Sequence, residues 1–164
     1  MWLSDRRVFL AGALAALGAC GFTPVYGPGG AGQTVLSQIT LTAPTTSNAY
    51  LFTRRFEERA GRGGVSPRYR MSVQLGTNQT GSGSVSSGAT TRFRIDGTAR
   101  YALRDSATDA VLLSGTTEAF TGYSTTGSTV ATLAAERDAV ERLMVILADR
   151  VIDALVLATP DLPG

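Results

Sequence analysis

Two stretches of the chain alternate strictly between apolar and polar positions. The first runs from Tyr69 to Leu75 and the second from Phe93 to Leu103, with Gly97 occupying one position of the apolar phase. Because successive side chains of a strand point to opposite faces of its sheet, each stretch predicts a strand with one apolar and one polar face. Arginine is frequent among the polar residues of both stretches, at Arg68, Arg70, Arg92, Arg94, Arg100 and Arg104.

The neighbouring segments complete an antiparallel meander. Residues 77–89 are small and polar and predict a long flexible connection between the two strands. Residues 105–109 predict a turn, after which the segment from Val111 to Phe120 predicts a strand that pairs back on the previous one. An earlier strand is predicted from Val35 to Ala43, where β-branched residues precede a proline.

Two helices are predicted from the remaining periodic segments. The first spans 48–61, with Asn48 or Ser47 as its N-cap and Gly61 at its end. The second spans 129–157 without an internal glycine or proline. Its apolar residues form one stripe suited to packing on the sheet, made of Leu133, Val140, Met144, Leu147, Val151 and Leu155. Outside the stripe lie Val145, Ile146 and Val156, which either meet the first helix or face a partner protein.

The order strand, helix, three strands, helix predicts an α+β fold of two layers. In this β-α-β-β-β-α sandwich, two helices pack on one face of a four-stranded, mostly antiparallel sheet. We expect one domain over residues 34–158, followed by a short tail at 159–164.

The N-terminal segment has the organisation of a secretory signal peptide. Arg6 and Arg7 precede a short run of uncharged, mostly apolar residues that ends at Ala19, and this run is too short to span a bilayer as a helix. Leu17 lies three residues before Cys20, the single cysteine, and this spacing resembles a bacterial lipobox. The resemblance implies cleavage between Ala19 and Cys20 and a lipid thioether on Cys20; the alternative is an ordinary signal peptide with a buried free cysteine.

Two other features of this region bear on export and anchoring. The arginine pair is similar to a twin-arginine export signal, although it can equally supply the positive charge of any signal peptide. Residues 20–33 are rich in glycine and proline, which predicts a lipidated tether ahead of the domain. Either export route leads out of the cytoplasm.

The composition disfavours catalysis, metal binding and nucleic-acid binding. The chain has no histidine, and all of its basic residues are arginine, so a serine nucleophile would lack its usual histidine or lysine partner. With Cys20 assigned to lipid, no Cys/His metal site can form. A formal net charge of +2 gives no reason to expect nucleic acid. We therefore expect a protein that is not an enzyme and that carries no cofactor other than the lipid.

Several motifs together resemble the LPS-assembly lipoproteins of the outer-membrane translocon, the LptE family. The similarity rests on the sequence Cys-Gly-Phe-Thr-Pro-Val-Tyr-Gly at 20–27, on residues 91–103, on Phe120 to Ser124, and on 134–139, in the predicted order of elements. It implies a lipoprotein anchored to the periplasmic leaflet of the outer membrane. The family resemblance further implies that the chain plugs a large β-barrel subunit, helps it to assemble, and helps to deliver lipopolysaccharide to the cell surface.

Arginine on the sheet suggests how such a protein contacts its ligand. Lipopolysaccharide carries phosphates, which guanidinium groups bind in a bidentate manner. Arg92 and Arg94 are the candidate residues for a lipopolysaccharide or barrel contact, against the alternative of an ordinary solvated sheet face. The competing function is a lipid-anchored scaffold, or a lipid-binding module, of another cell-envelope complex.

Overall fold

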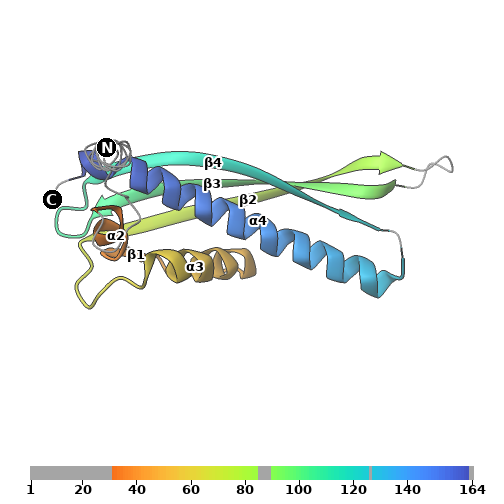
Figure 1. Ribbon diagram of the computed structural model, residues 1–164, viewed down its shortest axis with the longest axis horizontal. Coiled ribbons are helices and arrows are strands. Elements are labelled where there is room, and N and C mark those ends of the chain that lie inside the picture. The colour runs from red at the N-terminus through yellow and green to blue at the C-terminus, as the bar shows by residue number, and fades with distance from the viewer. Residues whose placement is uncertain (1–30, 85–89, 126, 163–164) are drawn as a thin grey trace, which may run out of the picture.

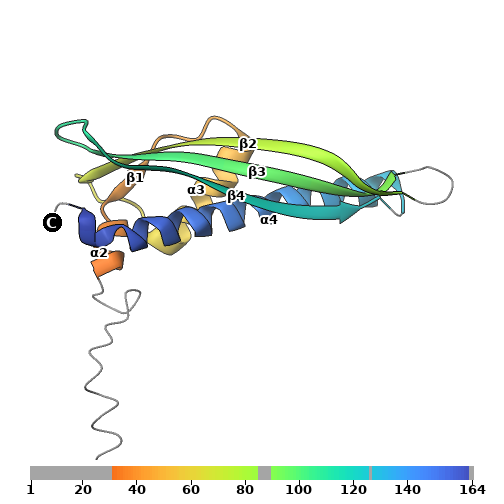
Figure 2. The same ribbon diagram turned by 90° about the horizontal axis from the view of Figure 1, so that it is seen from above.

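The computed structural model describes residues 31–84, 90–125 and 127–162, and shows an elongated α+β domain (Figures 1 and 2). A single sheet has the strand order β1-β2-β3-β4, and the helices gather on one of its faces. The predicted fold class is therefore confirmed. In chain order the elements are α2 (Ala31–Leu36), β1 (Ile39–Leu41), α3 (Ser47–Ala60), β2 (Tyr69–Ser84), β3 (Thr90–Asp105), β4 (Val111–Ser124), α4 (Thr129–Leu157) and the 3₁₀ turn η1 (Thr159–Asp161).

The β2–β3 hairpin is longer than its sequence predicts. Residues 77–84, predicted as part of a loop, continue β2, and Thr77, Gln79 and Gly81 lie opposite Gly97, Ile95 and Phe93 of β3. The loop prediction was wrong because the regular pattern of β3 offers an extended partner even to small polar residues. A strand of such composition gains its order from the strand beside it.

The strand predicted at 35–43 was also largely wrong. Its first residues end helix α2, and only Ile39–Leu41 form β1, which pairs in parallel with Tyr69–Met71 of β2. Leu36 and Ile39 are both fully buried. A helical turn followed by a short strand buries both side chains, which a continuous strand would place on opposite faces. Helix α2 also begins inside the segment predicted as tether.

Helix α3 begins and ends at identifiable caps. The Thr46 hydroxyl accepts a hydrogen bond from the Ala49 amide (3.1 Å), so the N-cap is Thr46 and not Asn48 or Ser47 as predicted. The helix ends at Gly61, as predicted, where φ is +85°. Phe52 and Phe56 are buried against the rest of the core.

Helix α4 runs along the sheet with the bounds predicted for it, 29 residues that rise about 44 Å. Met144, Leu147, Val151 and Leu155 are fully buried, and outside the predicted stripe Ile146 and Val156 join the same core. The chain itself therefore covers those two residues.

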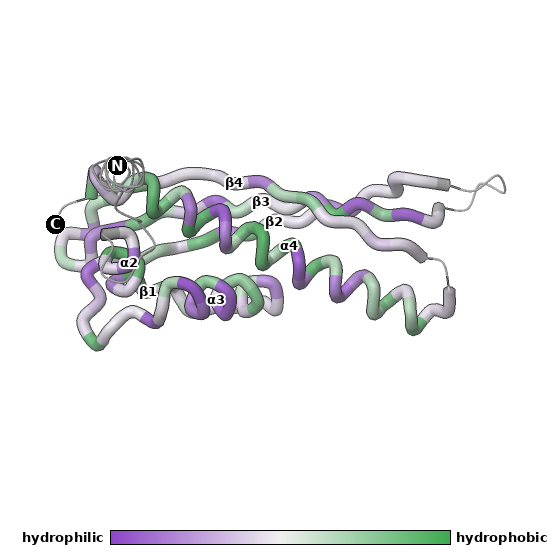
Figure 3. The backbone as a smooth tube through the Cα atoms, in the orientation of Figure 1, coloured by the Kyte–Doolittle hydropathy of each residue, from purple (hydrophilic) through white to green (hydrophobic). Residues whose placement is uncertain are grey.

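One stripe residue is not packed as predicted. Leu133 is 47% exposed, since α4 starts well before the stretch that α3 covers (Figures 1 and 3). At the other end, η1 gives the predicted tail local structure, and Leu162 packs against the core.

Candidate functional site

The face of the sheet opposite the helices carries most of the charged strand residues. On β3, Gly97, Ala99, Tyr101 and Leu103 are buried toward the helices, so the residues between them point to the other face. This outer face combines the arginines Arg70, Arg92, Arg94, Arg100 and Arg104 with two acidic residues, Asp96 and Glu118. The excess of arginine makes it the candidate site for an anionic ligand.

Arg94 lies at the most structured part of this face. Its Nε donates to Oδ1 of Asp96 at 2.7 Å, and its guanidinium carbon lies 3.7 Å from the centre of the Phe120 ring. The ion pair and the cation–π contact both restrain the side chain. A shallow depression opens here and is lined by Arg94, Asp96, Gly97, Thr98, Glu118, Ala119, Phe120 and Arg150.

Phe120 is a site residue that the sequence reasoning did not single out. Phe120 belongs to β4 and is 59% exposed, and it lies opposite Asp96 on the polar face. The alternation of the strand could have identified it: Ala119 and Thr121 are both buried, so Phe120 between them must point to the open face. An exposed aromatic ring beside arginine offers apolar and cationic contacts at one place.

Arg92 shares the face with Arg94 but has different surroundings. It is exposed, lies between Gly83 of β2 and Ser124 of β4, and makes no ion pair with any described residue. Its guanidinium is therefore available to a ligand, whereas the guanidinium of Arg94 already donates one hydrogen bond to Asp96. The structure thus brings both predicted residues to one face, two positions apart on β3.

The arginines at the opposite end of the face have structural partners. Asp109, which adopts a left-handed conformation (φ +58°) in the β3–β4 turn, lies 3.5 Å from Arg104 and 4.0 Å from Arg70. Asp105 organises the same turn, and hydrogen bonds from the backbone amides of Thr108 and Ala107 lower the pKa of its carboxyl.

The remaining two arginines differ in their placement. Arg68 precedes β2, and its guanidinium carbon lies 5.6 Å from the centre of the Tyr69 ring. Arg100 is exposed between Gln74 and Thr116 and has no ion-pair partner within the described ranges.

The other predictions concern lipidation at the N-terminus, metal binding and the membrane. Cys20 and the cleavage point after Ala19 lie outside the described residues. Within the described ranges, no group of three histidine, cysteine or acidic side chains is placed to hold a metal ion. In that same part of the chain, no helix combines the length and apolar character needed to cross a membrane.

Comparisons with known proteins agree with this architecture. A family model described as LptE, lipopolysaccharide-assembly, matches residues 35–155. A lipoprotein from Caulobacter crescentus has a similar solved structure, with a TM-score of 0.66, 19% identity, and coverage of 79% of this chain and 96% of that one. For rare lipoprotein B from Shewanella oneidensis the TM-score is 0.58 at 9% identity, with 75% and 95% of the two chains covered. For lipoprotein B from Nitrosomonas europaea the values are 0.57 and 13%, with 74% and 83% covered. No curated protein sequence matches the chain.

Proposed function

Because the chain belongs to the LptE lipopolysaccharide-assembly family, we propose that it is an outer-membrane lipoprotein that binds and plugs the β-barrel subunit of the lipopolysaccharide translocon. In this role it assists folding of the barrel and delivery of lipopolysaccharide to the cell surface. The observation that carries the proposal is the family match over residues 35–155, which spans most of the domain. The proposal assigns no catalytic step to the chain.

The shape and surface of the domain support residence inside a barrel. Strands β2, β3 and β4 have 14 to 16 residues, and a strand of that length extends about 50 Å, comparable to a whole bilayer with its headgroups. The uncovered sheet face is polar, as the interior of a large outer-membrane barrel is. A rod with such a face can lie along a water-filled lumen without burying unpaired charge.

The proposal includes a lipid anchor at Cys20. The chain would be cleaved after Ala19, and a lipid joined to the Cys20 sulfur by a thioether would hold the domain on the periplasmic leaflet of the outer membrane. Gly21 follows the cysteine where an aspartate would direct retention in the inner membrane of enteric bacteria. The apolar character needed for membrane attachment then comes from the lipid.

Arg92 and Arg94 are proposed to contact lipopolysaccharide phosphates or acidic groups of the barrel. Arg92 is exposed without an ion-pair partner among the described residues, and Arg94 is held beside the exposed ring of Phe120. A phosphate between the two guanidinium groups would receive charge-assisted hydrogen bonds, while an acyl or sugar surface would contact the ring.

Charge reversal tests this contact. The double variant Arg92→Glu, Arg94→Glu is compared with Arg137→Glu, which reverses an exposed arginine on α4. We expect the double variant to lose binding to purified lipopolysaccharide or to impair barrel assembly, and the control to retain both. Unchanged binding and assembly in the double variant would identify the face as an ordinary solvated surface.

The function itself is tested by mild-detergent extraction of outer membranes containing a C-terminally tagged chain. We expect a large β-barrel to copurify in a near-stoichiometric amount. Lipidated protein without any barrel would contradict the translocon role and favour a scaffold or lipid-binding module of another envelope complex.

A further inference from the structure

The outer edge of β2 is open along most of its length. Strand β1 pairs only with Tyr69–Met71, and beyond it the Thr42 amide donates to the Met71 carbonyl at 3.0 Å. From Ser72 onward no described strand pairs with this edge. Because Tyr69 and Met71 direct their backbone groups toward β1, and the β2–β3 register continues unbroken to Gly81, Val73 and Leu75 direct theirs outward as well.

The other free edge of the sheet is protected in a way that β2 is not. On β4, Arg142 donates to the Gly122 carbonyl at 3.3 Å, and Arg150 donates to the Glu118 carbonyl. Side-chain donors from α4 thus occupy acceptors that another strand would need. The β2 edge from Ser72 to Ser84 contains no charged residue, and uncharged open edges readily accept a further strand.

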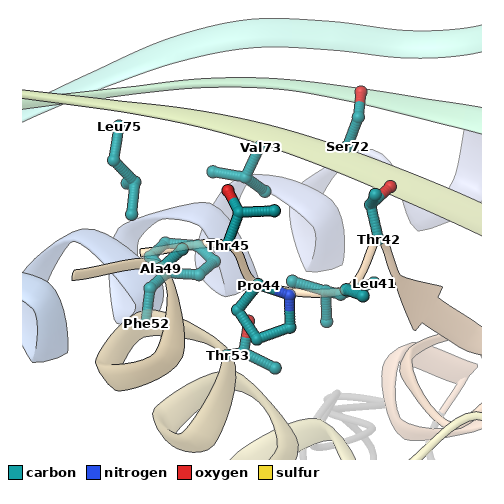
Figure 4. Close-up of a pocket in the computed structure, with 11 residues that line it drawn as sticks. Leu41, Thr42, Pro44, Thr45, Ala49, Phe52, Thr53, Ser72, Val73 and Leu75 are labelled. Carbon is teal, nitrogen blue, oxygen red and sulfur yellow. The ribbon is translucent and has the colours of Figure 1, made fainter. Parts of the chain in front are cut away.

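An apolar groove lies directly beside the open edge (Figure 4). Ser72, Val73 and Leu75 form one wall, and the first turns of α3 with the segment before it form the other. The cavity holds about 190 Å³, and its lining is uncharged throughout: Leu41, Thr42, Ala43, Pro44, Thr45, Ala49, Phe52, Thr53, Ser72, Val73 and Leu75. A strand edge facing a helix across an apolar groove is an arrangement that binds extended peptides, with backbone hydrogen bonds and a side-chain pocket.

We infer that this groove, between the open edge of β2 and helix α3, is the docking site for an extended, uncharged segment of the barrel partner. The segment adds a strand to β2 at Val73 and Leu75 and places one apolar side chain between Pro44 and Phe52. This inference rests on the proposed function, since it names the part of the chain that binds the barrel.

The geometry favours such a segment over the other occupants. In a second copy of this chain, one of the two outer edges of the sheet, that of β4, is already engaged by Arg142 and Arg150 of α4. A lipid acyl chain would fill the apolar part but leave the outward amides of Val73 and Leu75 unpaired.

The test uses the full lipidated chain in cells that make the barrel, with a photo-crosslinking amino acid in place of Thr45, an exposed residue of the groove. We expect an adduct between the chain and one extended segment of the barrel. The adduct should be lost in Ala49→Phe, which fills the groove from α3, and retained in Ala134→Phe, which adds the same bulk at an exposed position of α4.

Hydrogen exchange on the purified complex tests strand addition itself. The amides of Val73 and Leu75 should exchange at least about tenfold more slowly in the complex than in the free chain. An adduct with a second copy, or a copurified barrel that gives neither adduct nor protection, would overturn the inference while the proposed function stands. Failure of the wild-type chain to copurify any barrel would instead refute the proposed function.

Discussion

Two threonines on β4, the buried Thr121 and the half-buried Thr117, differ in whether their hydroxyl groups have hydrogen-bond partners. Both side chains point toward the helices, but the Thr121 hydroxyl donates to the Ala139 carbonyl of α4 at 2.9 Å, whereas the buried Thr117 hydroxyl has no hydrogen-bond partner among the described residues. A buried polar atom without a hydrogen-bond partner lowers the free energy of unfolding, whereas a buried hydrogen bond raises it. The two positions therefore form a matched pair for measurement.

Thr117→Val is expected to raise the free energy of unfolding by about 1 kcal/mol, because it removes an unpaired hydroxyl and conserves the volume of the side chain. Urea unfolding followed by circular dichroism measures the change. A destabilised variant would mean that the hydroxyl is hydrogen-bonded in solution.

The same substitution at Thr121 should have the opposite sign. Thr121→Val removes the hydrogen bond between β4 and α4 and is expected to lower the free energy of unfolding by about 1 kcal/mol. The same urea titration measures it. Equal effects at the two positions would show that the β4–α4 hydrogen bond contributes nothing.

Gly97 lets α4 approach the sheet. A Cβ atom at this position would lie 2.8 Å from Cδ2 and 3.0 Å from Cγ of Leu143, whose side chain is fully buried. Gly97→Ala is therefore expected to lower the free energy of unfolding by about 1–3 kcal/mol. Gly64→Ala, where nothing lies within 4 Å of the new Cβ, is the control and should be nearly neutral in the same thermal or urea titration.

The sequence shows Gly97 only as one member of the apolar phase of β3. Its role depends on Leu143, which lies on α4 and far along the chain, and no local pattern reports that contact. The exposure of Phe120 beside Arg94 depends in the same way on the β3–β4 register. The alternation of β3 is enough to place Arg92 and Arg94 on one face of the sheet. Which residues contact each arginine depends on the tertiary structure.

At the scale of elements, α3 and α4 are joined by an ion-pair cluster. Asp149 of α4 accepts from Arg55 at 2.9 Å and lies 3.1 Å from Arg59, and all three side chains are less than a third exposed. Burial by itself would raise the pKa of the Asp149 carboxyl, but the hydrogen bonds from Arg55 and Arg59 outweigh it and lower this pKa below its usual value.

Stability should therefore depend on the charge of Asp149. A carboxyl with a lowered pKa in the folded state stabilises the fold fully above its unfolded pKa of about 3.9, and this contribution is lost as the pH falls through the folded pKa. Asp149→Asn should cost about 1–2 kcal/mol at pH 7, and the difference from the wild type should shrink progressively below about pH 4. Urea titrations across this range measure it.

A control separates this cluster from surface charge in general. Asp138 pairs with Arg142 within α4, and both side chains are more than half exposed. Asp138→Asn should cost no more than about 0.5 kcal/mol at any pH. A pH-independent deficit in Asp149→Asn would show that the lost contribution is packing rather than charge.

Element boundaries were predictable where local chemistry sets them. Helix α4 has a capping serine at Ser128 and no internal glycine or proline, and its bounds followed from the sequence. The extension of β2 past Leu75 and the helix at Ala31–Leu36 did not follow, because the pairing with β3 and the burial of Leu36 decide them.

At the scale of the whole molecule, the sheet has one covered face, one open face and two unequal edges. Alternation in the strands predicted the two faces. The distinction between the edges was beyond the sequence, since it arises from the short β1 and from Arg142 and Arg150 reaching across from α4. An open polar face and an open strand edge are features that the proposed position inside a barrel would use.

Such a surface also predicts how the chain attaches to a membrane. The open sheet face is polar, and the proposed lipid on Cys20 would supply the apolar group that enters the bilayer. Purified lipidated protein is expected to float with phospholipid vesicles in a density gradient, and a chain starting at Gly21 is expected to stay behind.

Both proteins should unfold at the same urea concentration, because the core formed by the described residues begins at Val35, after the predicted tether. This equality shows that the difference in flotation reports anchoring rather than folding. If the chain starting at Gly21 also floats, the domain surface itself binds lipid, which would favour a lipid-binding module over a plug held in place by its anchor and its barrel.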